Sequence, residues 1–509
     1  GNYNVVVGDE AGTAITTGDD NVAVGYNALG ANTTGVSNVA VGANALDANT
    51  TAANNVAVGG SALTTNTTGA SNTAVGKFAL RYNTTASNNT AMGQNALSAN
   101  TTGTQNVAVG AASLDANTTA GSNTAIGYNS LGANTTGTFN TALGRQALLS
   151  NTTASNNVAV GGNALFQNTT GTSNVALGAY ALDSNTTASN NTAVGANALS
   201  ANTTGASNTA VGVNAGLSVT TGINNTLIGG LAGDALTDAD SNTAIGYNSL
   251  TTNTLGSAVT AVGSGALALH DVESAAQTFN TAVGYDAGNQ VTTGTSNTIM
   301  GGLSGDGLTV GSGNTLIGFE SGSYGTNLTT GATNTLVGAY NNTTAVDSAG
   351  AMGFGYNLDC AAGYTTLGSG TSDIRAAHGV ATWATVSDER YKKDITDSTA
   401  GLSFINALRP RTWNYKTLGE LPETFRAYEA DSTEVFKNTQ TNHGFIAQEV
   451  KVAIDADSGL KDGFRLWDDR EDGSQEVAEA ALIPVLTKAI QELSAQVDAL
   501  TARLTTLEG

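Results

Sequence analysis

The chain has 509 residues, of which 40 are Asp or Glu and 18 are Lys or Arg, and its formal net charge is −22. So acidic a chain is poorly suited to binding the phosphates of DNA or RNA, which excludes a nucleic-acid partner. The single cysteine, Cys360, excludes an internal disulfide and a cysteine metal cluster, and no apolar run reaches the roughly 20 residues of a membrane span. We therefore expect no cofactor, no metal and no membrane insertion.

Most of the chain is one repeated unit. The pattern Asn-[Val/Thr]-Ala-[Val/Ile/Leu/Met]-Gly recurs every 17 residues, with closing glycines from Gly8 to Gly263. A Leu follows the glycine after four residues in eleven successive units, and an Asn-Thr-Thr triplet begins after seven. The spacing then widens to 21 residues at Gly284, and we assign Gly353 and Gly368 to shorter units of 15, which gives 22 units in all.

The repeat predicts a parallel β-solenoid. Its apolar pieces are short, β-branched and separated by Gly, Asn and Thr, which is typical of strands and turns and not of helices. Stacked coils place the Val, Ile or Leu before each glycine in an apolar ladder and the Asn side chains in amide ladders. The alanines at Ala23, Ala40 and Ala57 leave a narrow face that a second chain could approach, so we expect a homotrimer.

The changes of period divide the chain into five segments. Regular repeats span 1–263, irregular repeats with loop insertions 264–368, a neck 369–386, a small α+β domain 387–482, and a helix 483–509.

Receptor contacts are expected where the solenoid departs from its period, because binding residues concentrate on loops. The candidate loops are residues 264–283 and 319–337. Tyr26, Tyr128 and Tyr247 share the outward position after the glycine and are further candidates.

Other motifs in the repeats have simpler interpretations. The Asn-Thr-Thr triplets match the glycosylation sequon, but a ladder position explains them better. Asp47, Asp115 and Asp183 lie in separate coils and do not indicate a convergent acidic cleft. His270 with Asp271 suggests a metal site together with Glu273, yet an inserted loop is the simpler explanation.

After residue 386 the period ends and charged residues become frequent. Helix-forming stretches, a strand-like segment 411–416 and the segment His443–Val450 precede a long C-terminal helix. Apolar residues on that helix alternate at spacings of four and three, as in a coiled coil whose seam requires oligomerisation. The seam residues are Leu486, Ile490, Leu493, Val497, Leu500, Leu504 and Leu507.

The order of these C-terminal elements resembles the intramolecular chaperone auto-processing domain of phage endosialidases, tailspikes and L-shaped tail fibres. The matching pieces are Ser387-Asp388-x-Arg390-x-Lys392, the ALRPRTWNYK segment, the GFIAQEV segment and the terminal coiled coil. The repeats resemble the head repeats of trimeric autotransporter adhesins and the repeat shafts of phage tail fibres. The inserted Asn-Thr-Thr segment departs from the adhesin pattern.

The resemblance implies a domain that assembles three chains, templates the fibre ahead of it and then cuts itself off. It implies Ser387 as nucleophile, Lys392 as base, and the bond between Val386 and Ser387 as the scissile bond. A Lys amine can act as the base when desolvation lowers its pKa. The alternative is that Ser387 caps a helix with Asp388 and Glu389 in the first turn.

These patterns favour a phage tail fibre or tailspike segment, located in the virion, that attaches to a host cell-surface receptor such as a glycan. Its expected partners are two further copies of itself and other tail proteins, bound through chain ahead of Gly1. Its only expected enzymatic activity is a single self-cleavage. The alternatives are a trimeric adhesin on a bacterial surface, a polysaccharide-degrading tailspike, and a membrane-bound transcription factor with the same processing module.

Overall fold

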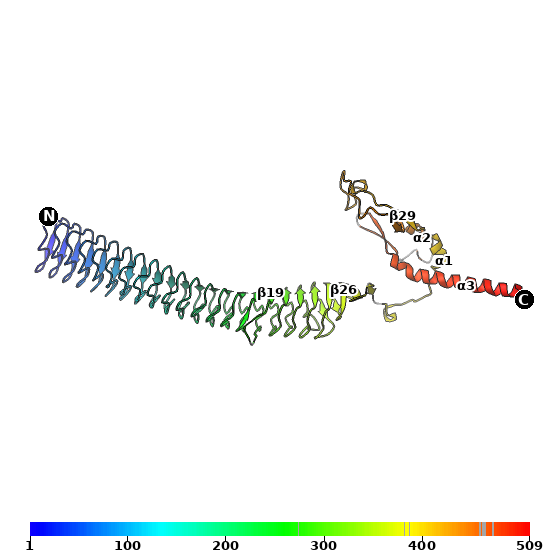
Figure 1. Cartoon of the computed structure of the whole chain (residues 1–509), viewed down its shortest axis with the longest axis horizontal. Coiled ribbons are helices and arrows are strands. Elements are labelled where there is room, and N and C mark those ends of the chain that lie inside the picture. The colour runs from blue at the N-terminus through cyan, green and yellow to red at the C-terminus, as the bar shows by residue number, and fades with distance from the viewer. Residues whose placement is uncertain are drawn as a thin grey trace. The chain divides into compact units, whose positions relative to one another are not determined.

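A computed structural model describes residues 1–508 apart from 273, 381, 386, 458–459, 461–464 and 471–472. The chain divides into two compact units, Gly1–Val386 and Ser387–Gly509. In Figure 1 the first unit is a long stack of coils and the second carries the helices. The two units are described separately below.

The first unit is a parallel β-solenoid with one short strand per coil in its main sheet, which confirms the predicted fold class. That sheet has 24 strands, and those from β1 to β24 each pair in parallel with the strand of the next coil. Its strands are β1 (Val5–Val7), β2 (Val22–Val24), β3 (Val39–Val41), β4 (Val56–Val58), β5 (Thr73–Val75), β6 (Thr90–Met92), β7 (Val107–Val109), β8 (Thr124–Ile126), β9 (Thr141–Leu143), β10 (Val158–Val160), β11 (Val175–Leu177), β12 (Thr192–Val194), β13 (Thr209–Val211), β14 (Thr226–Ile228), β15 (Thr243–Ile245), β17 (Thr260–Val262), β19 (Thr281–Val283), β20 (Thr298–Met300), β21 (Thr315–Ile317), β22 (Thr335–Val337), β24 (Met352–Tyr356), β26 (Tyr364–Ser369), β27 (Ser372–Ala377) and β28 (Ala384–Thr385).

The assignment of Gly353 as a closing glycine was wrong. Strand β24 pairs with β22 so that Val337 lies opposite Phe354, and Gly355 lies opposite Gly368 in β26. Gly355 therefore closes the unit. Gly353 occupies the inward mid-strand position, where a Cβ atom would lie 2.2 Å from the Sγ atom of Cys360.

The mid-strand alanine faces the interior of its own coil, contrary to the expectation that it forms a contact face. Ala23, Ala40 and Ala57 are fully buried within a single chain. The first and third strand residues, such as Val22 and Val24, are only half-buried. The predicted apolar ladder exists, with Val24 opposite Val41, but it lies on the outer surface of the coil.

Two buried asparagine ladders run along the solenoid, as predicted. The first ladder consists of the asparagine that precedes each strand. Asn38, for example, donates from Nδ2 to Asn21 Oδ1 at 3.1 Å and to the Ala52 carbonyl at 2.9 Å. In the Asn-Thr-Thr segment, Asn49 donates from Nδ2 to Asn32 Oδ1 at 2.9 Å. Both side chains are buried and hydrogen-bonded, so the triplet serves the coil's structure.

Up to the coil closed by Gly318, the coils are of two kinds, which differ at the fourth residue after the closing glycine. In most coils this residue is a buried leucine in the left-handed region, such as Leu29 with φ 56°. In six coils it is a glycine, and an aliphatic side chain then replaces the asparagine of the Asn-Thr-Thr segment. The pairs are Gly12 with Ile15, Gly216 with Val219, Gly233 with Leu236, Gly288 with Val291, Gly305 with Leu308, and Gly322 with Leu328.

Replacing the leucine by glycine, together with the asparagine by an aliphatic residue, conserves interior volume and relieves backbone strain. A left-handed conformation disfavours a bulky residue but suits glycine. A Cβ atom on Gly216 would lie 2.7 Å from Leu227 and 3.4 Å from Val219, so these side chains fill the space that the leucine leaves.

Two extra sheets accompany the irregular coils. Strand β16 (Gly256–Ser257) pairs with β18 (Ala276–Gln277) beside the first insertion. Strand β23 (Asn342–Thr343) pairs with β25 (Asp359–Cys360) near the end of the stack. Antiparallel pairing of β26 with β27 and of β27 with β28 then completes the main sheet.

The second unit is a small α+β fold, as expected. Its elements are η1 (Glu389–Tyr391), α1 (Leu402–Ala407), β29 (Arg411–Trp413), η2 (Leu418–Glu420), β30 (Asn442–Gly444), α2 (Ala447–Ala456), β31 (Trp467–Asp469), β32 (Gln475–Val477), η3 (Glu479–Ala481) and α3 (Leu482–Glu508). Phe404 of α1, Val450 of α2 and Val485 of α3 are buried in one apolar core. None of the described helices is long and apolar enough to cross a membrane.

Candidate functional site

The two proposed catalytic side chains contact each other at the start of the second unit. Lys392 Nζ donates a hydrogen bond to Ser387 Oγ at 2.8 Å. Both residues are exposed in the single chain. Val386, which would supply the attacked carbonyl, lies outside the described residues.

The short helix η1 holds this pair in place without using Ser387 as its cap. Asp388 is the N-cap residue, and its Oδ1 accepts a hydrogen bond from the backbone N–H of Arg390 at 2.8 Å. The Arg390 guanidinium also binds Asp388, with Nη2 at 2.6 Å from Oδ2, and this interaction lowers the pKa of the Asp388 carboxyl. The hydroxyl of Ser387 is thus left to Lys392.

The C-terminal helix has one face in the core of its unit and one face in solvent. Val485 and Ala489 are buried, and Glu492 Oε2 accepts from the backbone N–H of Leu402 at 2.8 Å, which satisfies the start of α1. All seven predicted seam residues are exposed, from 43% at Leu486 to 83% at Leu507. A single chain leaves this apolar seam without a partner.

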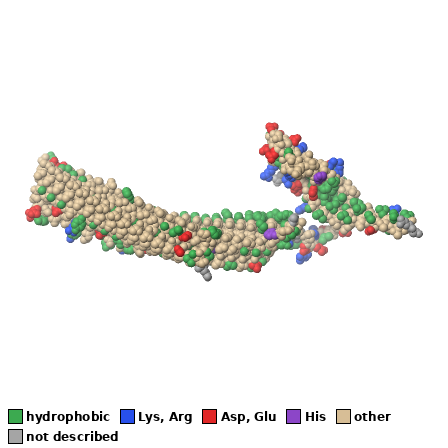
Figure 2. Space-filling model, in the orientation of Figure 1, with side chains coloured by type: hydrophobic (Ala, Val, Ile, Leu, Met, Phe, Trp, Pro, Cys, Tyr) green, Lys and Arg blue, Asp and Glu red, His purple; other side chains and the backbone are tan. Residues whose placement is uncertain are grey.

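The outer face of the main sheet is a second unpartnered apolar surface, here called the strand face. It comprises the first and third residues of each strand from β1 to β22, and all of them are Val, Thr, Ile, Leu or Met. Beyond the end strand β1, exposure on this face reaches 43% at Met92 and 46% at Leu177. Figure 2 shows the hydrophobic row along the edge where strands β19 to β26 lie in Figure 1.

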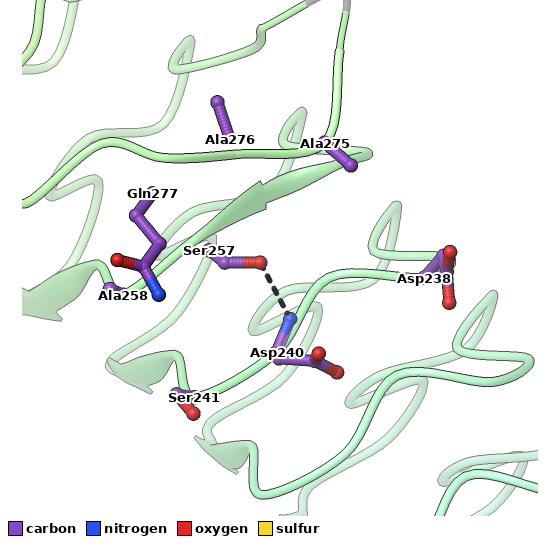
Figure 3. Close-up of a pocket in the computed structure, with 8 residues that line it drawn as sticks. All are labelled: Asp238, Asp240, Ser241, Ser257, Ala258, Ala275, Ala276 and Gln277. Carbon is purple, nitrogen blue, oxygen red and sulfur yellow. Dashed lines mark hydrogen bonds between the residues drawn. The ribbon is translucent and has the colours of Figure 1, made fainter.

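A polar cavity of about 310 Å³ lies beside the first insertion, on three successive coils (Figure 3). Asp240 donates from its backbone N to Ser257 Oγ at 2.9 Å, and Asp240 Oδ1 accepts from the Ile223 N–H at 2.7 Å. Asp238 and Gln277 also line the cavity. Part of the cavity wall, Ala275 to Gln277, belongs to the loop 264–283 that the sequence indicated for receptor contact.

Glu273, one of the three residues of the possible metal site at His270, lies outside the described residues, and the other two, His270 and Asp271, do not converge. The imidazole is buried, and its Nε2 lies 3.2 Å from Thr278 Oγ1. Burial lowers the pKa of His270, so the neutral ring is favoured. Asp271 is exposed and accepts from Thr254 instead. No group of three His, Cys, Asp or Glu side chains in the described part of the chain is arranged to hold a metal ion.

The scattered acids of the solenoid do not converge. Asp47 and Asp115 are four coils apart, which at about 4.8 Å per coil is roughly 19 Å. Paired carboxylates of a glycosidase stand at most about 9.5 Å apart. Partial burial raises the pKa of both carboxyl groups, but they lie too far apart to act as a pair.

The three tyrosines predicted to face outward do so. Tyr26, Tyr128 and Tyr247 are exposed by 51%, 55% and 58%.

The sequence did not indicate a cavity of about 820 Å³ in the second unit. Its walls combine the aromatic rings of Trp413, Tyr415 and Phe436 with the cationic side chain of Lys437. The rings of Tyr415 and Phe436 meet edge to face at 5.6 Å, and the Lys437 ammonium lies 5.3 Å from the Phe436 ring centre. The aromatic and cationic residues of the segment RTWNYK were the available signal, but this segment was interpreted as a strand and as part of the family resemblance, not as the wall of a cavity.

Comparison with known families identifies the start of the second unit. Residues 387–459 match the family model described as the chaperone of endosialidase. The match begins at Ser387 and includes Lys392 and the GFIAQEV segment, so the predicted resemblance is confirmed for this region. No curated protein and no solved structure matches the chain.

Proposed function

We propose that the chain is a segment of a trimeric phage tail fibre or tailspike that attaches to a host surface. Its C-terminal unit assembles three chains and then releases itself by cutting the bond between Val386 and Ser387. The observation that carries the proposal is the 2.8 Å contact between Lys392 Nζ and Ser387 Oγ at the first residues of the matched chaperone region.

The chemistry needs only groups of this chain and one water molecule. A neutral Lys392 amine accepts the proton of Ser387 Oγ as that oxygen attacks the Val386 carbonyl carbon. The Ser387 nitrogen leaves with a proton returned by Lys392, and Val386 is then esterified to the serine oxygen. Water hydrolyses the ester, giving a Val386 carboxylate and a free Ser387 amine.

Assembly can control this reaction because a base must be unprotonated. Both Ser387 and Lys392 are exposed in the single chain. Packing of three chains around this region would bury the amine and favour its neutral form. Cutting would then follow assembly and not precede it.

Two surfaces support association of identical copies. The exposed seam of α3 fits parallel helices of the same sequence. The strand face would be roughly 100 Å long and about 10 Å wide, on the order of 1,000 Å², from the usual strand spacings. This exceeds the roughly 800 Å² per partner of a standard interface. Another copy of the shaft has the matching 17-residue repeat, so its coils meet this face in register over its whole length.

Intact-mass measurement on purified protein tests the self-cleavage. Wild-type protein should separate into fragments 1–386 and 387–509 without added protease, while Ser387→Ala stays full length. Lys392→Ala should also stay intact or cut slowly. Lys393→Ala is the matched control, because it removes a neighbouring exposed lysine and should leave cleavage at the wild-type rate.

The same samples measure assembly by sedimentation. Ser387→Ala should remain trimeric and folded, since templating precedes cutting. A folded, trimeric wild-type protein that keeps its full mass of 50.7 kDa would refute the self-cleaving dyad. Equal cleavage in Lys392→Ala and Lys393→Ala would refute the role of Lys392 as base.

A further inference from the structure

An exposed cluster of four aromatic rings, here called the ring cluster, lies at the second insertion of the solenoid. Tyr340 is its centre and meets the other three rings edge to face. The ring centres of Phe319, Tyr324 and Tyr356 lie 5.5, 4.8 and 5.6 Å from that of Tyr340. The outer three rings are exposed by 44%, 47% and 52%.

The cluster depends on the departure from the 17-residue period. Phe319 and Tyr356 occupy the outward position directly after closing glycines, and Tyr340 occupies the next position of its coil. The fourth ring comes from the widened coil itself, since Tyr324 lies in the loop 319–337. In the described part of the first unit, the other exposed tyrosines form no such ring contacts.

The rings are pre-organised. They support one another edge to face, an arrangement that aromatic pairs favour. In the preceding coil, Gly302 lies next to Phe319, and a Cβ atom added there would lie 3.6 Å from the ring. The Phe319 ring therefore packs against the glycine backbone. Within the described residues the hydroxyls of Tyr324, Tyr340 and Tyr356 have no hydrogen-bond partner. The surface thus combines flat apolar faces with free hydroxyl groups.

These properties fit a carbohydrate. Tyrosine offers rigid amphipathic area at low entropic cost, and sugar rings present apolar C–H faces together with hydroxyl groups. Charge decides which sugars can bind. The cations of residues 1–386 are Lys77, Arg81, Arg145 and Arg375, and among the described contacts none of them lies over a ring of the cluster. Because sialylated, uronic and phosphorylated sugars require cationic partners, they are poor ligands here.

We propose that the ring cluster is a binding site for neutral hexose or N-acetylhexosamine units of a host-surface polysaccharide. The inference rests on the proposed attachment function. The proposed cut at Val386 supports the inference further. The cluster belongs to the last coils before that bond, so release of the second unit would leave these coils near the end of the fibre.

The test uses the purified full chain on an array of neutral oligosaccharides and of sialylated and uronic oligosaccharides. Wild-type protein should bind neutral oligosaccharides, and Tyr324→Ser and Tyr356→Ser should each weaken that binding at least tenfold. Tyr324 is the safer variant for folding, because it lies in an inserted loop. Tyr180→Ser is the matched control: Tyr180 occupies the column of Tyr340, is 47% exposed and stands alone, so binding should not change.

Sedimentation and intact mass on the same samples separate this inference from the proposed function. If wild-type and Tyr324→Ser proteins are both trimeric and cut, and bind neutral oligosaccharides equally, the ring cluster is not the site. The inference also fails if only anionic oligosaccharides bind. Loss of the trimer in Tyr324→Ser would overturn it as well, because the rings would then be a contact between copies.

Discussion

Residues 1–386 and residues 387–509 bury their apolar side chains in different ways. In the solenoid a buried residue such as Ala40 lies between its own equivalents, Ala23 and Ala57, so the core is one repeated contact. In the second unit a small core joins α1, α2 and α3, whose residues are far apart in sequence.

Under the proposed function, this difference would separate the residues that set the shape of the shaft from those that associate the chains. A coil of the solenoid is stabilised by contacts with its neighbouring coils, so a single coil has little core of its own. Starting such a stack is therefore costly, as is usual for repeat structures. In the proposed function the α3 seam brings chains together before any coil forms, and this would give the second unit a role in assembly that the solenoid lacks.

The largest effect is expected from breaking the α3 seam. Leu493→Asp would place carboxylates in the coiled-coil core, where an unpaired charge is strongly unfavourable. We expect monomeric or aggregated shaft by sedimentation, although Leu493 lies outside the solenoid. Gln491→Asp on the same helix, outside the seam, should assemble normally; a normal trimer from Leu493→Asp would show that the seam is dispensable.

A charge on the strand face should have the next largest effect. Val194→Asp would bury one carboxylate per chain if this face lies between copies, and burial of an unpaired charge is costly. We expect a large loss of thermal stability and partial dissociation on dilution. Ala196→Asp, two residues away and outside the strand face, should have little effect. Equal stability of the two variants would exclude the strand face as an interface.

A leucine placed in a coil of the glycine kind should destabilise that coil, and further substitutions in its surroundings should reduce the loss. Gly216→Leu would clash with Leu227 and add a left-handed leucine, costing about 1–3 kcal/mol by analogy with other overpacked cores. Adding Leu227→Ala and Val219→Asn removes the clash and restores the Leu and Asn pair of the common coil, but it also opens space beside Gly233 of the next coil, so thermal stability should be recovered in part. If the triple variant melts no higher than the single variant, volume exchange does not explain the two kinds of coil.

The smallest effect concerns a partly buried acid. Desolvation raises the pKa of Asp183 above its ordinary value, and its Oδ1 has no hydrogen-bond partner. The folded state therefore binds the proton more tightly, so stability falls as the pH rises through the ordinary carboxyl pKa to the raised one. Asp183→Ser should stabilise the shaft at neutral pH by less than about 1 kcal/mol after solvent screening. The gain should vanish below the ordinary carboxyl pKa, as pH-dependent melting would reveal.

The sequence was informative about the solenoid because each coil stacks on an equivalent one. Asn21 and Asn38 form a ladder since equal spacing places equal side chains in register, and the parallel sheet follows from the same argument. The α3 seam was equally readable, since heptad spacing fixes which residues share a helix face.

The candidate site was predictable only in part. Ser387 and Lys392 were identified by resemblance, but a separation of five residues does not determine whether two side chains meet. The contact requires the turn of η1, whose N-cap residue is Asp388 and not Ser387. The ring cluster was harder still, because Phe319, Tyr340 and Tyr356 come together only when three coils stack.

By itself, the sequence determined the 17-residue register, the asparagine ladders, the small α+β unit and the α3 seam, because each follows from a spacing along the chain. The tertiary structure decided which side of the strand faces inward. In a three-residue strand such as Val22–Val24, the pattern is compatible with the middle side chain facing inward or with the two outer side chains facing inward. The turns at Gly25 and Leu29, both with positive φ, direct Ala23 into the coil. It also decided that Gly355 closes its coil, because pairing between strands and not the glycine pattern sets the register there.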